Sequence, residues 1–220
     1  MILQRKSVPV TAQGKEVIGQ GGLMNLEAND NDLLQYPAGY IPAHWHPELE
    51  LFALLSGKVR INADSESYEL RPGEGCFLNT EVVHSFQALG LGECRFHSFV
   101  FDPAIVGGFP GSVFDVKFVR PILDSGASFI KLNREDQPFF SALAAGIKAC
   151  HEEKPSFELT LRDTLSQAVC YVGRQGAFEA RKAPSVQEER LKEMLLWIDS
   201  HWEEPVGVSE LAAAGHISLR

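Results

Sequence analysis

The pattern of apolar and polar residues between positions 49 and 101 is that of short strands. Val59 and Ile61 alternate with the polar residues around them, which predicts a strand with one face in water. Gly and Pro interrupt the pattern, as in Pro72-Gly73. Short strands at this spacing are typical of an antiparallel sandwich or barrel. The strand character falls in six runs, at 49–55, 58–62, 67–70, 75–78, 83–88 and 94–101.

The run 51–55 differs from the others because it is apolar on both faces. A strand of that kind lies at the centre of a sheet, and another element should cover its outer side. The residues up to about Glu27 are mixed and contain four glycines, so we expect an arm with at most a short strand there. The segment 33–37 then leads the chain into the barrel.

After Pro103 the pattern changes from strand to helix. Residues 104–136 are irregular, because Gly and Pro interrupt any long element. Apolar stripes at helical spacing follow from Gln137 to Lys154-Pro155, and from Ser156 to about Gly173. This helical pair packs either on its own domain or against a second subunit, and the pattern leaves both arrangements open.

The segment 176–187 gathers small and polar residues around Pro184, which is typical of a linker. A helical stripe then runs from about Val186 to His201. Glutamate and aspartate outnumber lysine and arginine from residue 185 onward. Phosphate contacts need a positive face, so we expect no specific DNA binding by this 220-residue chain.

The last residues have the pattern of a helix, a tight turn and the start of a second helix. Ser209 is expected to cap a short helix that ends before Gly215. Ser218 is placed to cap another helix, of which Leu219 and Arg220 are the first residues. This arrangement resembles a helix-turn-helix unit, and a simple helical cap is the alternative.

Composition limits the classes of protein that fit this chain. It has 220 residues, 45% hydrophobic and 22% charged, without a stretch of 18 apolar residues. The first seven residues lack the apolar segment of a signal peptide, so we expect a cytoplasmic protein without membrane contact. The net charge of −9 argues against a surface dominated by nucleic-acid binding. The four cysteines are widely spaced and are expected as buried free thiols.

Ligand chemistry concentrates in one stretch, immediately before the apolar run. Side chains alternate along an extended strand, so His44, His46 and Glu50 are predicted to point the same way. A hairpin would bring His84 back beside them. Imidazole nitrogens and a carboxylate are good ligands for zinc, nickel or iron, which predicts a divalent metal site. Histidines that bind only one another, water or a small ligand are an equal alternative.

The order of these features resembles the AraC family of transcriptional regulators. His44-Trp45-His46-Pro47-Glu48-Leu49-Glu50 through Gly57 fits the cupin pattern His-x-His-x3-Glu-x6-Gly. Pro72-Gly73-Glu74 and His84 match the second cupin pattern more loosely. At the C-terminus the likeness is carried by 205–212 and 216–218.

The resemblance implies a mainly β cupin barrel of the antiparallel jelly-roll type, an α-helical dimerisation and linker region, and the start of an all-α helix-turn-helix domain. It also implies a homodimer through the helical pair. DNA would be bound by a complete helix-turn-helix domain, in which Ser218, Leu219 and Arg220 begin the recognition helix. The implied domains are the barrel at 1–105 with an arm at 1–27, the helical pair at 106–175, the linker at 176–187, and the truncated DNA-binding half at 188–220.

Two classes of function fit these features. The first is a ligand-responsive regulator whose barrel binds a small-molecule effector, for which the resemblance suggests a sugar, with or without a metal ion. The second is a metal-dependent cupin enzyme, a dioxygenase or isomerase, with His44, His46 and His84 as ligands and Glu50 completing the set. The segment 186–220 favours the regulator, because an enzyme has no evident need for it. The effector-binding residues are not identified by the sequence.

Overall fold

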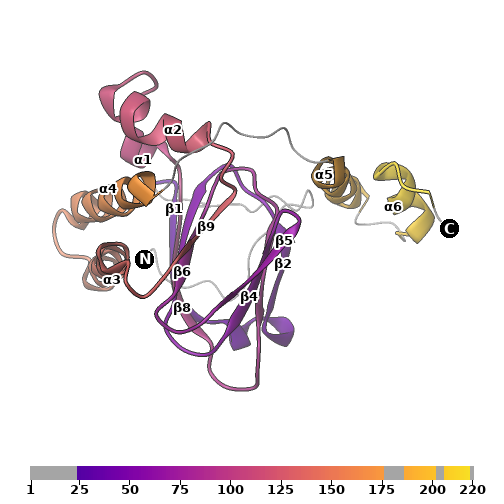
Figure 1. Ribbon diagram of the computed structural model, residues 1–220, viewed down its shortest axis with the longest axis horizontal. Coiled ribbons are helices and arrows are strands. Elements are labelled where there is room, and N and C mark those ends of the chain that lie inside the picture. The colour runs from indigo at the N-terminus through magenta and orange to yellow at the C-terminus, as the bar shows by residue number, and fades with distance from the viewer. Residues whose placement is uncertain (1–23, 176–185, 202–205, 219–220) are drawn as a thin grey trace.

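Two antiparallel sheets face each other in the computed structural model, which describes residues 24–175, 186–201 and 206–218 (Figure 1). The strand order is β1-β8-β3-β6-β9 in one sheet and β2-β7-β4-β5 in the other. The predicted fold class, a mainly β barrel followed by helices, is confirmed. The strands are β1 (Leu26–Asp32), β2 (Tyr40–His44), β3 (Leu49–Leu54), β4 (Val59–Ala63), β5 (Glu66–Leu70), β6 (Gly75–Leu78), β7 (His84–Ala88), β8 (Arg95–Phe101) and β9 (Phe129–Leu132).

Helices cover the outer face of the five-stranded sheet. In β3, Leu51 and Ala53 point to that face and pack with residues of α3 and α4, whereas Phe52 and Leu54 point between the sheets. The expected cover over the apolar run is therefore present. The helical elements are the 3-10 turns η1 (Leu33–Gln35) and η2 (Pro37–Gly39), α1 (Ala104–Gly107), the π-helical turn η3 (Asp115–Val119), α2 (Arg120–Leu123), α3 (Gln137–Glu152), α4 (Phe157–Gln175), α5 (Val186–Ser200) and α6 (Val208–Ala214).

The apolar stripes of α3 and α4 are largely used inside the chain. Leu143 and Ile147 of α3 and Leu161 and Leu165 of α4 are buried in the same cluster as the outer face of the sheet. Of the two arrangements left open above, packing on the same domain therefore holds for these stripes. No helix in the described ranges is both long and apolar enough to cross a bilayer.

The six predicted strand runs agree with β3 to β8, but β1, β9 and β2, which ends where the extended histidine stretch was predicted to begin, were missed. β1 has the sequence LEANDND, and Asn and Asp are depleted in strands. It nevertheless pairs with β8 along its whole length, from Leu26 opposite Phe101 to Asp32 opposite Arg95. β9 joins the edge of the same sheet beside β6, from within the segment expected to be irregular. In β1 sheet pairing outweighs weak local strand propensity. In β9 the sequence FIKL does favour a strand, but the run is only four residues long.

The C-terminal helices lie on the side of the barrel away from α3 and α4 (Figure 1). The cap of α6 differs from the prediction: Gly207 takes the N-cap position, and its backbone N–H donates to Glu210 at 2.9 Å. Ser209 lies within the helix. Ser218 follows α6 without helical structure. Leu219 and Arg220, together with 1–23 of the predicted arm and 176–185 of the predicted linker, lie outside the described residues.

Candidate metal centre

Three histidines meet at one end of the space between the sheets. His44 is the last residue of β2 and His84 is the first of β7, and the two are directly opposite each other in the strand pairing. His46 lies in the short connection from β2 to β3. All three side chains are buried, with at most 3% of their surface exposed. One ring nitrogen from each lies within 4.8 Å of the others, so a single ion can be reached by all three.

The structure corrects the reason for this convergence. Residues 44–50 do not form one strand, because β2 ends at His44 in the four-stranded sheet and β3 begins at Leu49 in the five-stranded sheet. The alternation along one strand therefore does not align His44 with Glu50. They approach each other because the chain crosses from one sheet to the other between them.

Backbone carbonyls fix the orientation of each imidazole. The Nδ1 atoms of His44, His46 and His84 lie 2.7, 3.0 and 2.9 Å from the carbonyl oxygens of Pro42, Glu48 and Val82. A carbonyl only accepts, so Nδ1 carries the proton that it donates. Nε2 is then the nitrogen with the lone pair in each neutral ring. This outer-shell arrangement is typical of metal-binding histidines.

Glu50 brings a carboxylate to the same point from the facing sheet. Its Oε2 is 3.1 Å from Nε2 of His84 and 3.6 Å from Nε2 of His46. Burial raises the pKa of Glu50, but hydrogen bonds from His46 and His84 outweigh it and bring the pKa to about 2. Glu50 is therefore ionised at neutral pH, which is the form that ligates a metal.

The protonation of the histidines follows from the same geometry. Burial and the neighbouring His84 and His46 hold the pKa of His44 well below its usual range, so this ring is neutral. His46 and His84 already donate through Nδ1, so Nε2 can donate to Glu50 only when the ring is doubly protonated. A metal ion at Nε2 would replace that proton. Protons and a metal ion therefore compete for the same atoms.

The residues present fit a divalent transition metal. Three imidazole nitrogens and one carboxylate match the donors that zinc, nickel and iron prefer, rather than the all-oxygen set typical of magnesium. The predicted residues His44, His46, Glu50 and His84 are thus brought together. Trp45, which lies between His44 and His46 in the chain, is half-buried, and the amine of Lys192 in α5 lies 5.2 Å from the centre of its ring.

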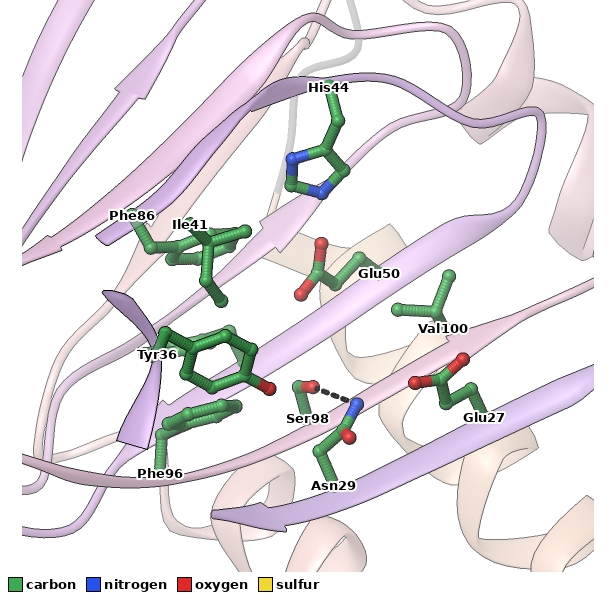
Figure 2. Close-up of a pocket in the computed structure, with 11 residues that line it drawn as sticks. Glu27, Asn29, Tyr36, Ile41, His44, Glu50, Phe86, Phe96, Ser98 and Val100 are labelled. Atoms are coloured by element: carbon green, nitrogen blue, oxygen red, sulfur yellow. Dashed lines mark hydrogen bonds between the residues drawn. The ribbon is translucent and has the colours of Figure 1, made fainter. Parts of the chain in front are cut away.

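A small cavity continues from His44 and Glu50 into the barrel (Figure 2). The space open to the centre of a water-sized sphere is about 20 Å³. One buried water needs roughly 10–15 Å³ on that measure, so the cavity as it stands holds about one water and no sugar ring. The lining residues are Glu27, Asn29, Tyr36, Ile41, His44, Glu50, Phe52, Phe86, Phe96, Ser98 and Val100.

Sequence reasoning missed the polar part of this lining. Glu27 and Glu50 are both cross-strand neighbours of Val100, so the two carboxylates flank it on the inner face of the five-stranded sheet. In the next row Asn29 donates to the Ser98 hydroxyl at 3.2 Å (Figure 2). Glu27 falls at the end of the segment that we expected as an arm because of its mixed composition and glycines, and no strand was predicted for the residues that follow it. The eleven lining residues that the structure describes include neither Lys nor Arg.

The comparisons with known proteins agree with the predicted family. The profile of the AraC-like ligand binding domain matches residues 34–169, which is more than half of the chain. The uncharacterized HTH-type transcriptional regulator YdeC of Bacillus subtilis (strain 168) is 25% identical over 187 residues. The alignment covers 82% of this chain and 62% of that protein, so the chain spans about 62% of its relative's length.

Solved structures give weaker likenesses. ToxT from Vibrio cholerae O395, bound to (E)-4-(8-methylnaphthalen-1-yl)but-3-enoic acid, is 12% identical, with a TM-score of 0.48 and coverage of 88% of this chain and 72% of that chain. A predicted oxalate decarboxylase from Thermotoga maritima is 21% identical, with a TM-score of 0.28 and coverage of 30% and 57%. Neither likeness bears on the ligand of this protein. The match of the family profile does establish the family: the chain belongs to the AraC-like ligand-binding domains.

Proposed function

We propose that this protein is a ligand-responsive transcriptional regulator whose barrel holds a divalent transition metal ion beside the effector cavity. The observation that carries the proposal is the buried histidine cluster, in which one ring nitrogen of each histidine lies within 4.8 Å of the others, inside a domain of a ligand-binding family. His44, His46 and His84 would hold the ion, and Glu50 would be a fourth ligand or a hydrogen-bonding partner. The ion would supply a fixed positive charge at the end of the cavity.

The effector is proposed to be a small polar molecule that lies between the metal centre and the row of Glu27, Asn29 and Ser98. Carboxylate, amide and hydroxyl groups favour a ligand rich in hydroxyl or amino donors. A sugar has the required hydroxyl groups. The cavity is too small for one as it stands, so binding a sugar would require the aromatic walls formed by Tyr36, Phe86 and Phe96 to move.

A second copy of the chain is the proposed partner in a homodimer, and the outer face of α4 is the proposed contact. Exposed apolar side chains gather there. Leu159 of α4 is 67% exposed, and Phe114 and Phe118 of the neighbouring segment are 52% and 44% exposed. Together with Val106, Arg162, Asp163, Ser166 and Cys170 they line a groove of about 560 Å³. Arg162 and Asp163 carry opposite charges, so two antiparallel copies of α4 can pair them reciprocally.

DNA recognition is proposed for a complete helix-turn-helix domain. In the described part of the chain α6 follows α5, and the relative with an HTH-type name extends beyond the matched region. The alternative is a metal-dependent cupin enzyme, a dioxygenase or isomerase, and the same four metal-ligand candidates favour it. The C-terminal helices favour the regulator, because they contribute no residue to the cavity lining.

The test is to purify the chain without chelator and measure its metal content by mass spectrometry. Thermal shifts are then recorded for the metal-loaded and metal-free protein against a panel of sugars, polyols and small amines. We expect about one metal ion per chain and a stabilising effector whose affinity depends on the metal. If the purified protein contains no metal and still binds a sugar, the proposed metal centre is contradicted. The proposed role as an effector sensor would remain. Turnover of a panel member would favour the enzyme.

A further inference from the structure

Two loops beside the histidine cluster, which we call the histidine loops, contact α5. One loop, 45–48, contains Trp45 and His46, and the other, 79–83, ends next to His84. The backbone N–H of Glu81 donates to the carbonyl of His46 at 2.9 Å, so the two loops are joined directly. Any displacement of one loop is therefore transmitted to the other.

Lys192 of α5 contacts both loops at once. Its amine is 3.7 Å from Oε2 of Glu81 and 5.2 Å from the centre of the Trp45 ring. The ammonium group is attracted to the carboxylate and to the face of the indole ring. The side chains of Lys192 and Glu81 are 27% and 38% exposed, so water screens the ion pair in part. The contact is thus of moderate strength and can be made or broken.

The backbone at Glu81 is held in a conformation that an L-residue seldom adopts, with φ of 65°. Such a left-handed residue costs about 1 kcal/mol or more and persists only where the surroundings hold it. Here the N–H bond to His46 and the side-chain contact with Lys192 both act on the same residue. Glu81 therefore links the geometry beside the histidine cluster to the position of α5.

Movement of α5 would carry α6 with it. A Cβ placed on Gly215, just after α6, would lie 2.6 Å from the sulfur of Met194 in α5, so the two segments pack closely. The N–H of Gly215 also donates to the carbonyl oxygen of Leu211 at 2.9 Å, which joins Gly215 to the end of α6. The pair α5–α6 thus responds as one unit to what happens at Lys192.

We propose that Lys192 is a positioning residue that docks the α5–α6 unit onto the two histidine loops, so that the occupancy of the histidine cluster and the docking of these helices control each other. This inference rests on the proposed function, because it takes the cluster as a metal centre. Coupling of this kind is reciprocal: if a bound ion favours docking, docking favours the ion by the same factor. The contacts of Lys192 would then couple the state of the sensor cavity to the position of the segment that resembles a DNA-binding unit.

The experiment uses the full chain with Zn²⁺ as the probe. Hydrogen–deuterium exchange is measured for α5 and for the loops 45–48 and 79–83 in the unaltered protein, in K192Q, in E81Q and in the double variant. K148Q is the matched control, because Lys148 is an exposed lysine on α3 that pairs with Glu152 at 4.0 Å. Zinc affinity is measured in parallel by competition with a chromophoric chelator.

We expect α5 and both loops to exchange about three- to fivefold faster in K192Q than in K148Q, the range set by one screened ion pair and one exposed cation–π contact. The double variant should exchange no faster than K192Q, because K192Q already removes both contacts of Lys192, whereas E81Q removes only the ion pair and leaves the contact with Trp45. Zinc should slow exchange of α5 in the unaltered protein but not in K192Q. The affinity of the protein for zinc should be lower in K192Q, by the same factor by which zinc slows the exchange of α5 in the unaltered protein.

Two results would overturn the inference: loop and α5 exchange in K192Q equal to that in K148Q, or zinc binding to the unaltered protein and K192Q with equal affinity. If zinc binds none of the proteins, the metal centre fails, and with it the control of docking by occupancy. Faster exchange of the two loops in K192Q would then still establish docking through Lys192, so the two failures are distinguishable.

Discussion

His44 and His84 are cross-strand partners on β2 and β7, and their ring centres lie 4.2 Å apart. Neighbouring strands put directly opposite side chains about 4.5–5.5 Å apart at Cβ, so the sheet itself holds the two imidazoles together. The geometry of the His44–His84 pair therefore depends on strand register, whereas the position of His46 depends on the loop 45–48. A change that preserves β2 and β7 should leave the remaining ligands in place.

Replacing His46 by alanine should remove most of the bound metal and leave the barrel folded. His46 supplies one of three nitrogen ligands, whereas the core between the sheets is built from apolar residues such as Phe52, Ile61 and Phe86. We expect at least a tenfold loss of zinc affinity, typical of losing one metal ligand or its support. Isothermal titration and far-UV circular dichroism measure the two effects. His216→Ala changes an exposed histidine and should bind zinc normally; equal affinity in both variants would contradict the assignment.

Lowering the pH should destabilise the metal-free protein through His44. The folded pKa of His44 lies below its ordinary value of about 6.5, so the unfolded chain binds more protons in that interval. The stability from neutral His44 is present above about pH 6.5 and is lost as the pH falls toward the folded pKa. One proton contributes at most about 1.4 kcal/mol per pH unit. The free energy of unfolding is measured with urea, in the presence of chelator, at pH 7.5 and 5.5. It should change less between the two pH values in His44→Gln than in the unaltered protein. An equal change in both proteins would exclude this role of His44.

Gly57→Ala should destabilise the barrel by about 2 kcal/mol or more. Gly57 has φ of +80°, and a Cβ there would lie 2.5 Å from the carbonyl oxygen of Glu93. Both the left-handed backbone and the clash with backbone atoms oppose a side chain. Gly92→Ala is the control, because no atom lies within 4 Å of its added Cβ. Denaturant unfolding of the two variants measures the difference, and similar midpoints would contradict the structural account of the last residue in the cupin pattern.

Leu159→Asp should dissociate the proposed dimer without unfolding the chain. Leu159 is exposed on the outer face of α4, so a charge there affects only a partner. Leu165, at 1% exposure, lies in the chain's own core, and Leu165→Asp should unfold the domain instead. Sedimentation velocity at micromolar concentration distinguishes the outcomes. An unaltered chain that sediments as a monomer would refute the dimer.

The 220-residue chain should not bind DNA with sequence specificity. Residues 185–220 carry seven acidic side chains against two arginines and one lysine, and DNA affinity depends on neutralising phosphates. A gel-shift titration against a library of duplexes at low salt tests this. Salt-sensitive binding to a defined sequence by this chain would show that the charge argument fails.

The sequence by itself determined the strands β3 to β8, the helices α3 and α4, and the identity of four metal-ligand candidates. These features are local: alternation reports which residues of a strand face the core, and a helical stripe reports the buried side of a helix. The family resemblance was also available, because the order of barrel, helical pair, linker and helix-turn-helix start is more specific than the cupin pattern at 44–57 alone.

Tertiary structure decided how the candidates meet and what surrounds them. His44 and Glu50 converge across two sheets, and pairing between distant segments cannot be read from alternation along one of them. No strand was predicted at β1, where Asn and Asp are frequent. In the fold Glu27 and Asn29 line a cavity, where polar side chains are expected only once the opposite wall is known. The contact of Lys192 with both histidine loops joins residues more than a hundred positions apart. Local periodicity specifies elements, whereas the site arises from their long-range packing.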